Sequence, residues 1–233
     1  MSPISFEVNP EYAEILEIVP GLFSSGVSAL TAENMKKYRI SFIVNTTCEV
    51  PNLRMLGNIP RTKLWLKDES DANVYPILAF QADQIEEVIR DGGCVLVHDV
   101  AGVSRSATIC LAYLVKYQHY SLKDAYRHMQ LKRPMVRPNI GFWQQLIAFE
   151  KEITGQAASV DLIQNPTENG KLEPDVYSRV SRDIPSLTFT EVCERHHTSS
   201  QPIPCKREPS FQPVLSPLLS FGSNLTDSIG SAA

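Results

Sequence analysis

The sequence predicts an α/β domain with a central, mostly parallel sheet flanked by helices, and three observations support this prediction. Short strand-like apolar runs alternate with helical patterns up to about residue 154. One run, 94–98, is apolar up to its final histidine, which is typical of a strand buried on both faces of a parallel sheet. Beyond residue 155 the alternation stops and the composition changes.

Apolar and β-branched residues mark three strands, which we expect at 40–45, 62–66 and 94–98. Apolar periodicity predicts five helices, at about 31–38, 74–90, 105–119, 122–132 and 141–153. Thr31 and Ser121 are residue types that cap helix N-termini. Pro134 cannot continue the fourth helix, and Gly155 is suited to end the last.

The chain divides by composition. Residues 155–233 hold 8 of the 16 prolines together with 12 serines, and they keep no apolar stripe for three helical turns. Such a segment cannot bury enough apolar area to offset the entropy of ordering its backbone. We therefore predict an N-terminal extension (1–14), one domain (15–154) and a disordered Ser/Pro-rich tail (155–233). A small second domain after residue 155 is the alternative.

Composition excludes several classes of protein. A formal net charge of −4 argues against a nucleic-acid partner bound by bulk charge. No apolar stretch approaches about 18 residues, so we expect no membrane span. The N-terminus lacks the basic start and apolar core of a signal peptide. Five scattered cysteines suit a reducing compartment, so we expect a cytoplasmic location, with the nucleus as a further site.

The segment from His98 to Ser106 has the clearest chemistry. It leaves the predicted buried strand and leads directly into an apolar helix. Ligands of open α/β sheets bind at the carboxyl ends of the strands. The free amides of such a loop suit an oxyanion, and Arg105 can add a bidentate contact to phosphate. An ordinary strand–turn–helix with a surface arginine is the simpler alternative.

The segment His98-x-x-Ala-Gly-x-Ser-Arg-Ser106 resembles the His-Cys-x5-Arg-Ser loop of cysteine-dependent protein phosphatases, specifically of small, atypical dual-specificity phosphatases. The resemblance covers about residues 15–153. Residues 18–26 resemble the family's opening hairpin, and 43–47 resemble its second strand. From Arg133, the run Arg-Pro-x-Val-Arg-Pro-Asn-x-Gly-Phe-Trp-x-Gln-Leu is similar to the family's closing motif.

The resemblance implies a role for each matched residue. In that family a cysteine attacks phosphorus, an arginine holds the phosphoryl oxygens, and an aspartate protonates the leaving group. The resemblance implies Arg105 as that arginine and Asp68 as the general acid, with Asp71 as the alternative. It implies that Ser106 assists breakdown of the intermediate, and we expect His98 to orient the loop. The expected phosphate-binding backbone comprises Val100, Ala101, Gly102, Val103, Ser104 and Arg105. The resemblance implies no metal and no cofactor.

Asp99 stands at the position of the family's nucleophilic cysteine. We expect its carboxylate to reach into the phosphate space, to accept hydrogen bonds from loop amides and to pair with Arg105. Aspartate is a poor nucleophile toward phosphate monoesters unless a metal offsets the charge. Losing about five decades of covalent catalysis corresponds to about 7 kcal/mol of transition-state stabilisation. The sequence therefore predicts a catalytically inactive or severely impaired phosphatase-like protein, a pseudophosphatase that binds or scaffolds signalling proteins.

Other interpretations stay open. The chain is alternatively a dual-specificity phosphatase, acting on phosphotyrosine and phosphoserine/threonine, whose cysteine has been replaced at position 99. An aspartyl-phosphate enzyme is a further alternative. We expect Cys94 and Cys110 to be inert core residues, and Trp65 to be a core residue as well. The resemblance implies phosphorylated proteins as partners, with mitogen-activated protein kinases among them.

Overall fold

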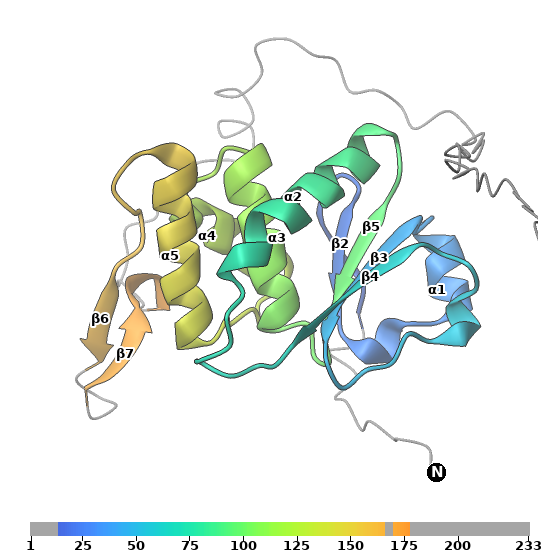
Figure 1. Ribbon diagram of the computed structural model, residues 1–233, viewed down its shortest axis with the longest axis horizontal. Coiled ribbons are helices and arrows are strands. Elements are labelled where there is room, and N and C mark those ends of the chain that lie inside the picture. The colour runs from blue at the N-terminus through green and yellow to red at the C-terminus, as the bar shows by residue number, and fades with distance from the viewer. Residues whose placement is uncertain (1–13, 166–169, 178–233) are drawn as a thin grey trace, which may run out of the picture. The chain divides into compact units, whose positions relative to one another are not determined.

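A computed structural model describes residues 14–165 and 170–177. Five strands form one sheet in the order β1-β2-β5-β3-β4, as Figure 1 shows. Their bounds are β1 Leu16–Val19, β2 Leu22–Ser25, β3 Phe42–Thr47, β4 Arg61–Leu66 and β5 Val95–His98. The pairs β2–β5, β5–β3 and β3–β4 are parallel, and only β1 pairs antiparallel, with β2. The predicted mostly parallel sheet is confirmed.

Helices cover both faces of the sheet. Helices α2 to α5 lie on one side and α1 lies on the other (Figure 1). Their bounds are α1 Ala32–Lys37, α2 Tyr75–Arg90, α3 Arg105–Tyr117, α4 Leu122–Lys132 and α5 Ile140–Thr154. The larger core cluster packs under α2 to α5, and a smaller one lies between the sheet and α1. In the part of the chain that the structure describes, single turns of 3-10 helix occupy Val27–Ala29, Arg54–Leu56 and Asp175–Tyr177.

The helix ends follow the signals in the sequence. Thr31 Oγ1 accepts a hydrogen bond from the amide of Asn34, and Ser121 Oγ accepts one from the amide of Asp124, both at 3.1 Å. Gly155 ends α5 in a left-handed conformation, with φ of 66°. These three predicted caps are therefore confirmed, because each satisfies backbone groups that a helix end leaves without partners.

Strand β5 is the centre of the sheet. Its four residues are buried, and it lies in parallel between β2 and β3. The prediction of a strand covered on both faces, made from the apolar run in the sequence, is thus confirmed. Because neighbouring parallel strands end at the same edge, the chain leaving β5 meets the chain that leaves β3.

The region after α5 differs from the prediction. Strands β6 (Leu162–Asn165) and β7 (Lys171–Pro174) form an antiparallel hairpin. Val160 is buried in the main core, and Lys123 on α4 forms a 2.7 Å ion pair with Asp175 just after β7. The domain boundary predicted at residue 154 is therefore corrected, because described structure continues to Tyr177. The rest of the predicted tail, 166–169 and 178–233, and the extension up to residue 13 lie outside the described residues.

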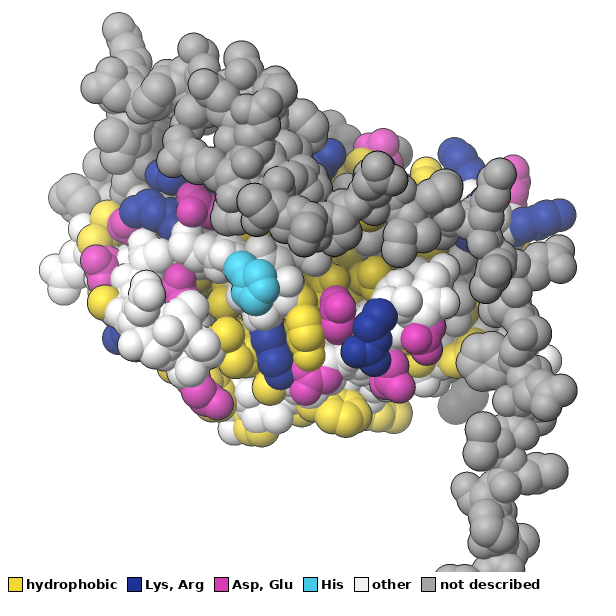
Figure 2. Space-filling view, turned by 90° about the horizontal axis from the view of Figure 1, so that it is seen from above, with side chains coloured by type: hydrophobic (Ala, Val, Ile, Leu, Met, Phe, Trp, Pro, Cys, Tyr) yellow, Lys and Arg dark blue, Asp and Glu magenta, His cyan; other side chains and the backbone are white. Residues whose placement is uncertain are grey.

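The described part of the chain contains no helix that is long and apolar enough to cross a membrane. On the face of the molecule that Figure 2 shows, basic and acidic side chains lie interspersed. This mixture agrees with the nearly balanced charge of the sequence, 22 basic against 26 acidic residues.

Candidate active site

The 98–106 loop joins β5 to α3 at the carboxyl edge of the sheet. Neighbouring elements fix its backbone from two sides. Thr46 Oγ1 on β3 donates to the carbonyl of His98 at 2.9 Å. The amide of Val27, just after β2, donates to the carbonyl of Val100 at 3.0 Å. The fold therefore places the loop where α/β sheets bind ligands.

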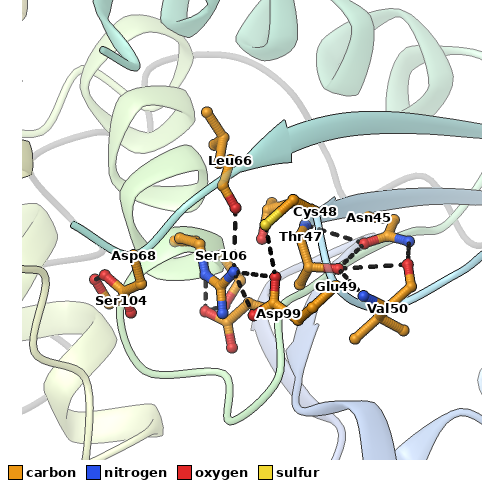
Figure 3. A network of polar contacts seen from close by, with 12 residues as sticks. Asn45, Thr47, Cys48, Glu49, Val50, Leu66, Asp68, Asp99, Ser104 and Ser106 are labelled. Carbon is orange, nitrogen blue, oxygen red and sulfur yellow. Dashed lines mark hydrogen bonds and ion pairs between the residues drawn. The ribbon is translucent and has the colours of Figure 1, made fainter. Parts of the chain in front are cut away.

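The carboxylate of Asp99 is bonded within its own loop. Asp99 is 2% exposed. Its Oδ1 accepts a hydrogen bond from the amide of Gly102, and its Oδ2 accepts two from Ser106, from the amide and from the hydroxyl, each at 3.0 Å. Figure 3 shows Asp99 and Ser106 at the centre of this network. The expectation that Asp99 accepts loop hydrogen bonds agrees with this geometry.

Arg105, in contrast, has a different partner from the expected one. Its Nη1 lies 2.8 Å from the carboxylate of Glu49, which follows β3, and 3.1 Å from the carbonyl of Leu66 on β4. The expected Arg105–Asp99 ion pair is therefore replaced by an Arg105–Glu49 pair. Arg105 is 5% exposed, and its Nε has no hydrogen-bond partner within the described residues. One donor of a buried guanidinium thus remains available at the site.

Glu49 holds its negative charge readily. Partial burial by itself would raise the pKa of the Glu49 carboxyl. Hydrogen bonds from its own backbone amide, from Cys48 and from Arg105, together with the charge of Arg105, outweigh burial and bring the pKa below its ordinary value. Sequence reasoning missed Glu49. It follows β3, which pairs with β5, so it lies at the same edge of the sheet as the 98–106 loop.

Arg133 supports the loop from behind. It is fully buried, and its Nε donates to the carbonyl of Gly102 at 2.7 Å while its Nη2 donates to that of Ala101 at 2.8 Å. Gly102 has φ of 72°, and a Cβ there would lie 2.5 Å from Nη2 of Arg133. Only glycine meets both requirements without strain. Arg133 belongs to the closing motif, but sequence reasoning gave it no role.

Asp68 lies at the rim of the loop. Its Oδ1 accepts hydrogen bonds from Ser104 Oγ at 2.7 Å and from Asn139 Nδ2 at 2.8 Å. Figure 3 shows Asp68 beside Ser104. The alternative acid, Asp71, is exposed three residues further on. The structure thus brings Asp68 into contact with the loop, as the resemblance implies for an acid.

His98 is buried at the end of β5, and its Nδ1 lies 3.3 Å from the carbonyl oxygen of Asp99. Burial lowers the pKa of His98 from 6.5 to about 4, and the hydrogen bond and charge of Asp99 oppose this shift only in part. The imidazole is therefore neutral at neutral pH. Its position fits the expected role of orienting the loop.

The other candidates are a cysteine and a tryptophan. Cys110 on α3 is fully buried, and burial raises the pKa of its thiol to about 12, which fits the expectation of an inert residue. Trp65 is not a core residue: it is 67% exposed, with φ of 54°. The β3–β4 register slips between Asn45 and Thr47, so β4 holds an extra residue there, and this bulge turns Trp65 outward. Within the described ranges, no three His, Cys, Asp or Glu residues are grouped to hold a metal.

The sequence is similar to those of known proteins. Residues 22–152 match the family model described as dual specificity phosphatase, catalytic domain. The chain is similar to human dual specificity protein phosphatase 14, with 38% identity over 171 residues, covering 73% of this chain and 84% of the relative. It is also similar to human dual specificity protein phosphatase 21, with 37% identity over 179 residues and coverage of 76% and 92%.

Solved structures agree. Human DUSP28 superimposes with a TM-score of 0.57 and 27% identity, covering 59% of this chain and 93% of that one. Human tyrosine phosphatase-like serine/threonine/tyrosine-interacting protein gives a TM-score of 0.55 and 28% identity, with coverage of 59% and 96%. The sheet, the loop and these comparisons together show that the chain belongs to the dual specificity phosphatase family.

Proposed function

We propose that this chain is a catalytically inactive dual-specificity phosphatase-like protein that binds and scaffolds signalling proteins. The observation that carries the proposal is the carboxylate of Asp99, which accepts the hydrogen bonds of Gly102 and Ser106 inside the 98–106 loop. The loop that would hold a phosphoryl group is thereby partly filled by a side chain of the protein itself.

Two physical arguments support inactivity. A carboxylate attacks phosphate monoesters poorly without a metal ion to offset the charge. Both oxygens of Asp99 are also engaged by donors, and hydrogen bonding stabilises the anion in place. Losing the covalent step by about five decades corresponds to about 7 kcal/mol, which neither Arg105 nor Asp68 can supply by holding or protonating the substrate.

The binding role rests on what the chain retains. The loop, its support by Arg133 and the contact of Asp68 with Ser104 are all in place. One similar structure bears the name tyrosine phosphatase-like serine/threonine/tyrosine-interacting protein, and this name describes a protein of this fold by its interactions. A fold that keeps its site geometry without a nucleophile is suited to recognition.

Relatives that are phosphatases imply phosphorylated proteins as the partners. Mitogen-activated protein kinases in the cytoplasm and nucleus are the partners that we propose within this class. Because Asp99 occupies the loop, we expect the surface around it, rather than the loop amides, to provide most of the contact.

The substitution Asp99→Cys tests the proposal. A cysteine restores the missing nucleophile and leaves Arg105, Ser106 and Asp68 unchanged, so we expect p-nitrophenyl phosphate turnover to appear where the wild-type chain has none. Asp99→Ser is the matched control: it also removes the carboxylate but supplies no thiolate, so it should remain inactive while binding vanadate.

Added substitutions in the Asp99→Cys chain separate the roles. Arg105→Lys should reduce turnover strongly, because a point charge cannot reproduce the planar guanidinium. Asp68→Ala should slow the hydrolysis of aryl phosphates that have poor leaving groups more than the hydrolysis of those that have good ones. An Asp99→Cys chain that folds but neither turns over nor binds vanadate would show that the site has lost more than its nucleophile. Turnover by the wild-type chain would contradict the proposal itself.

A further inference from the structure

Tyr177, the last residue that the structure describes, inserts its ring beside the core of the helical layer. The ring centroid lies 5.5 Å from that of Tyr126 on α4 and 5.7 Å from that of Trp143 on α5. The guanidinium of Arg137 stacks over the ring at 4.4 Å. Burial raises the pKa of the Tyr177 phenol, so the hydroxyl keeps its proton and acts as a donor.

The hairpin before Tyr177 is fastened to the domain. Lys123 Nζ donates to Asp175 Oδ2 at 2.7 Å, and the amide of Asp175 donates to the carbonyl of Asp161 at 2.8 Å. The ion pair with Lys123 therefore holds the segment that carries Tyr177 against α4.

A continuous chain of hydrogen bonds runs from this hydroxyl to the candidate site. Trp143 Nε1 donates to Tyr177 Oη at 2.6 Å, and Tyr177 Oη donates to the carbonyl of Pro138 at 3.1 Å. That carbonyl shares one planar peptide unit with the amide of Asn139, which donates to Ser104 Oγ at 3.1 Å. Ser104 Oγ donates in turn to Asp68 Oδ1 at 2.7 Å.

The two ends fix the direction of this chain. An indole N–H is only a donor, and Oδ1 of Asp68 accepts at the other end, so every hydroxyl between them accepts from one neighbour and donates to the next. Hydrogen bonds aligned in this way polarise and strengthen one another. Loss of one member should weaken the others, including the last bond to Asp68.

We propose that Tyr177 is a positioning residue for Asp68, acting through the Pro138–Asn139 peptide and Ser104. The hairpin after α5, with the Tyr177 that follows it, is then part of the site. Asn139 strengthens the coupling, because its side-chain amide also donates to Asp68 Oδ1 at 2.8 Å. This inference concerns the geometry of the site and holds whether or not the chain turns over phosphate.

The test is a double-mutant cycle on the full-length protein, in which the denaturant concentration at the midpoint of unfolding is measured for each variant. Tyr177→Phe removes only the hydroxyl, and Asp68→Ala removes the acceptor at the far end of the hydrogen-bond chain. We expect the shift caused by Tyr177→Phe to be clearly smaller when Asp68 is already Ala. In the Asp68→Asn background, where an acceptor oxygen remains, most of the original shift should return.

Tyr126→Phe is the matched control. Tyr126 packs in the same aromatic cluster as Tyr177. Its Oη donates to the carbonyl of Val136 at 3.0 Å, so it is not a member of the hydrogen-bond chain that leads to Asp68. Its shift should be the same with Asp68 or Ala at position 68. Equal shifts for Tyr177→Phe in both backgrounds would overturn the proposal.

An amide NMR spectrum provides a second readout that simple loss of packing would not move. The hydrogen bond from Tyr177 polarises the Pro138–Asn139 peptide, so Tyr177→Phe should move the Asn139 amide proton upfield, and Tyr126→Phe should leave it in place. An unmoved Asn139 amide in Tyr177→Phe would also overturn the proposal. Neither measurement uses phosphatase activity, so failure here is distinct from failure of the proposed function.

Discussion

Nη1 of Arg105 lies 2.8 Å from each carboxylate oxygen of Glu49. The residue that would hold phosphate is thus paired with an internal anion that comes from the end of a neighbouring strand. Asp99 accepts hydrogen bonds from the loop, so two carboxylates of the protein itself occupy groups that would otherwise bind phosphate. Each of the two carboxylates leads to its own prediction.

Glu49→Gln should increase the affinity for anions. The substitution keeps the size of the side chain but removes the charge that competes for Arg105. Since the Glu49 side chain is 39% exposed, solvent screens the pair, and we expect a gain of about 1 kcal/mol, or about fivefold. Calorimetric titration of vanadate into Asp99→Ser, with and without Glu49→Gln, measures it. Weaker binding in the double variant would show that Glu49 aligns Arg105 rather than competing for it.

Asp99→Ala should destabilise the domain and make its stability depend on phosphate. The substitution leaves the donors of Gly102 and Ser106 without their acceptor in a buried site, at a cost of about 2 kcal/mol. Inorganic phosphate should restore part of this loss by binding the folded state. Thermal unfolding with increasing phosphate measures the effect, and the wild-type midpoint should stay constant. A wild-type midpoint that rises as steeply as that of the variant would contradict the account.

Gly102→Ala should be more destabilising than Gly155→Ala. Both glycines have positive φ, 72° and 66°, where a side chain costs about 1 to 2 kcal/mol of backbone strain. A Cβ at Gly155 meets nothing within 4 Å, whereas one at Gly102 lies 2.5 Å from Arg133 Nη2 and 2.8 Å from the backbone of Ser25. Urea unfolding of the two variants isolates the contact. Equal losses would mean that Arg133 can move away without cost.

The stability of the domain should fall as pH is lowered from about 6.5 to 4. Burial lowers the pKa of His98 to about 4, whereas in the unfolded chain it is near 6.5. Between these values the unfolded state binds the extra proton, so acid favours unfolding by up to about 1.4 kcal/mol per pH unit. His98→Asn should flatten this dependence in urea titrations. Identical slopes for the variant and the wild type would exclude His98 as the cause.

The sequence predicts most of the fold because its local signals agree with the packing. The continuous run of β5 and the caps Thr31, Ser121 and Gly155 each satisfy a backbone or burial requirement that neighbouring residues reveal. The hairpin after α5 escapes the same reasoning. Its strands are four residues each, half of these residues are exposed, and it is held by a few contacts, such as Lys123–Asp175, that composition does not reveal.

The site is predictable only as far as the family loop extends. Asp99, Arg105, Ser106 and His98 lie within nine consecutive residues, and the resemblance identifies them together. Glu49 is 56 residues from Arg105, and only the pairing of β3 with β5 brings the two together. Trp65 stands in a short apolar run of the sequence, but a bulge turns it toward solvent.

The measurement that tests the central claim most directly is steady-state hydrolysis of p-nitrophenyl phosphate by the wild-type full chain, beside Arg105→Ala. If Asp99 leaves the loop without a nucleophile, both chains should match the buffer blank, with and without Mg²⁺. Turnover by the wild-type chain that Arg105→Ala abolishes would contradict the account, and dependence of that turnover on Mg²⁺ would indicate an aspartyl-phosphate enzyme instead.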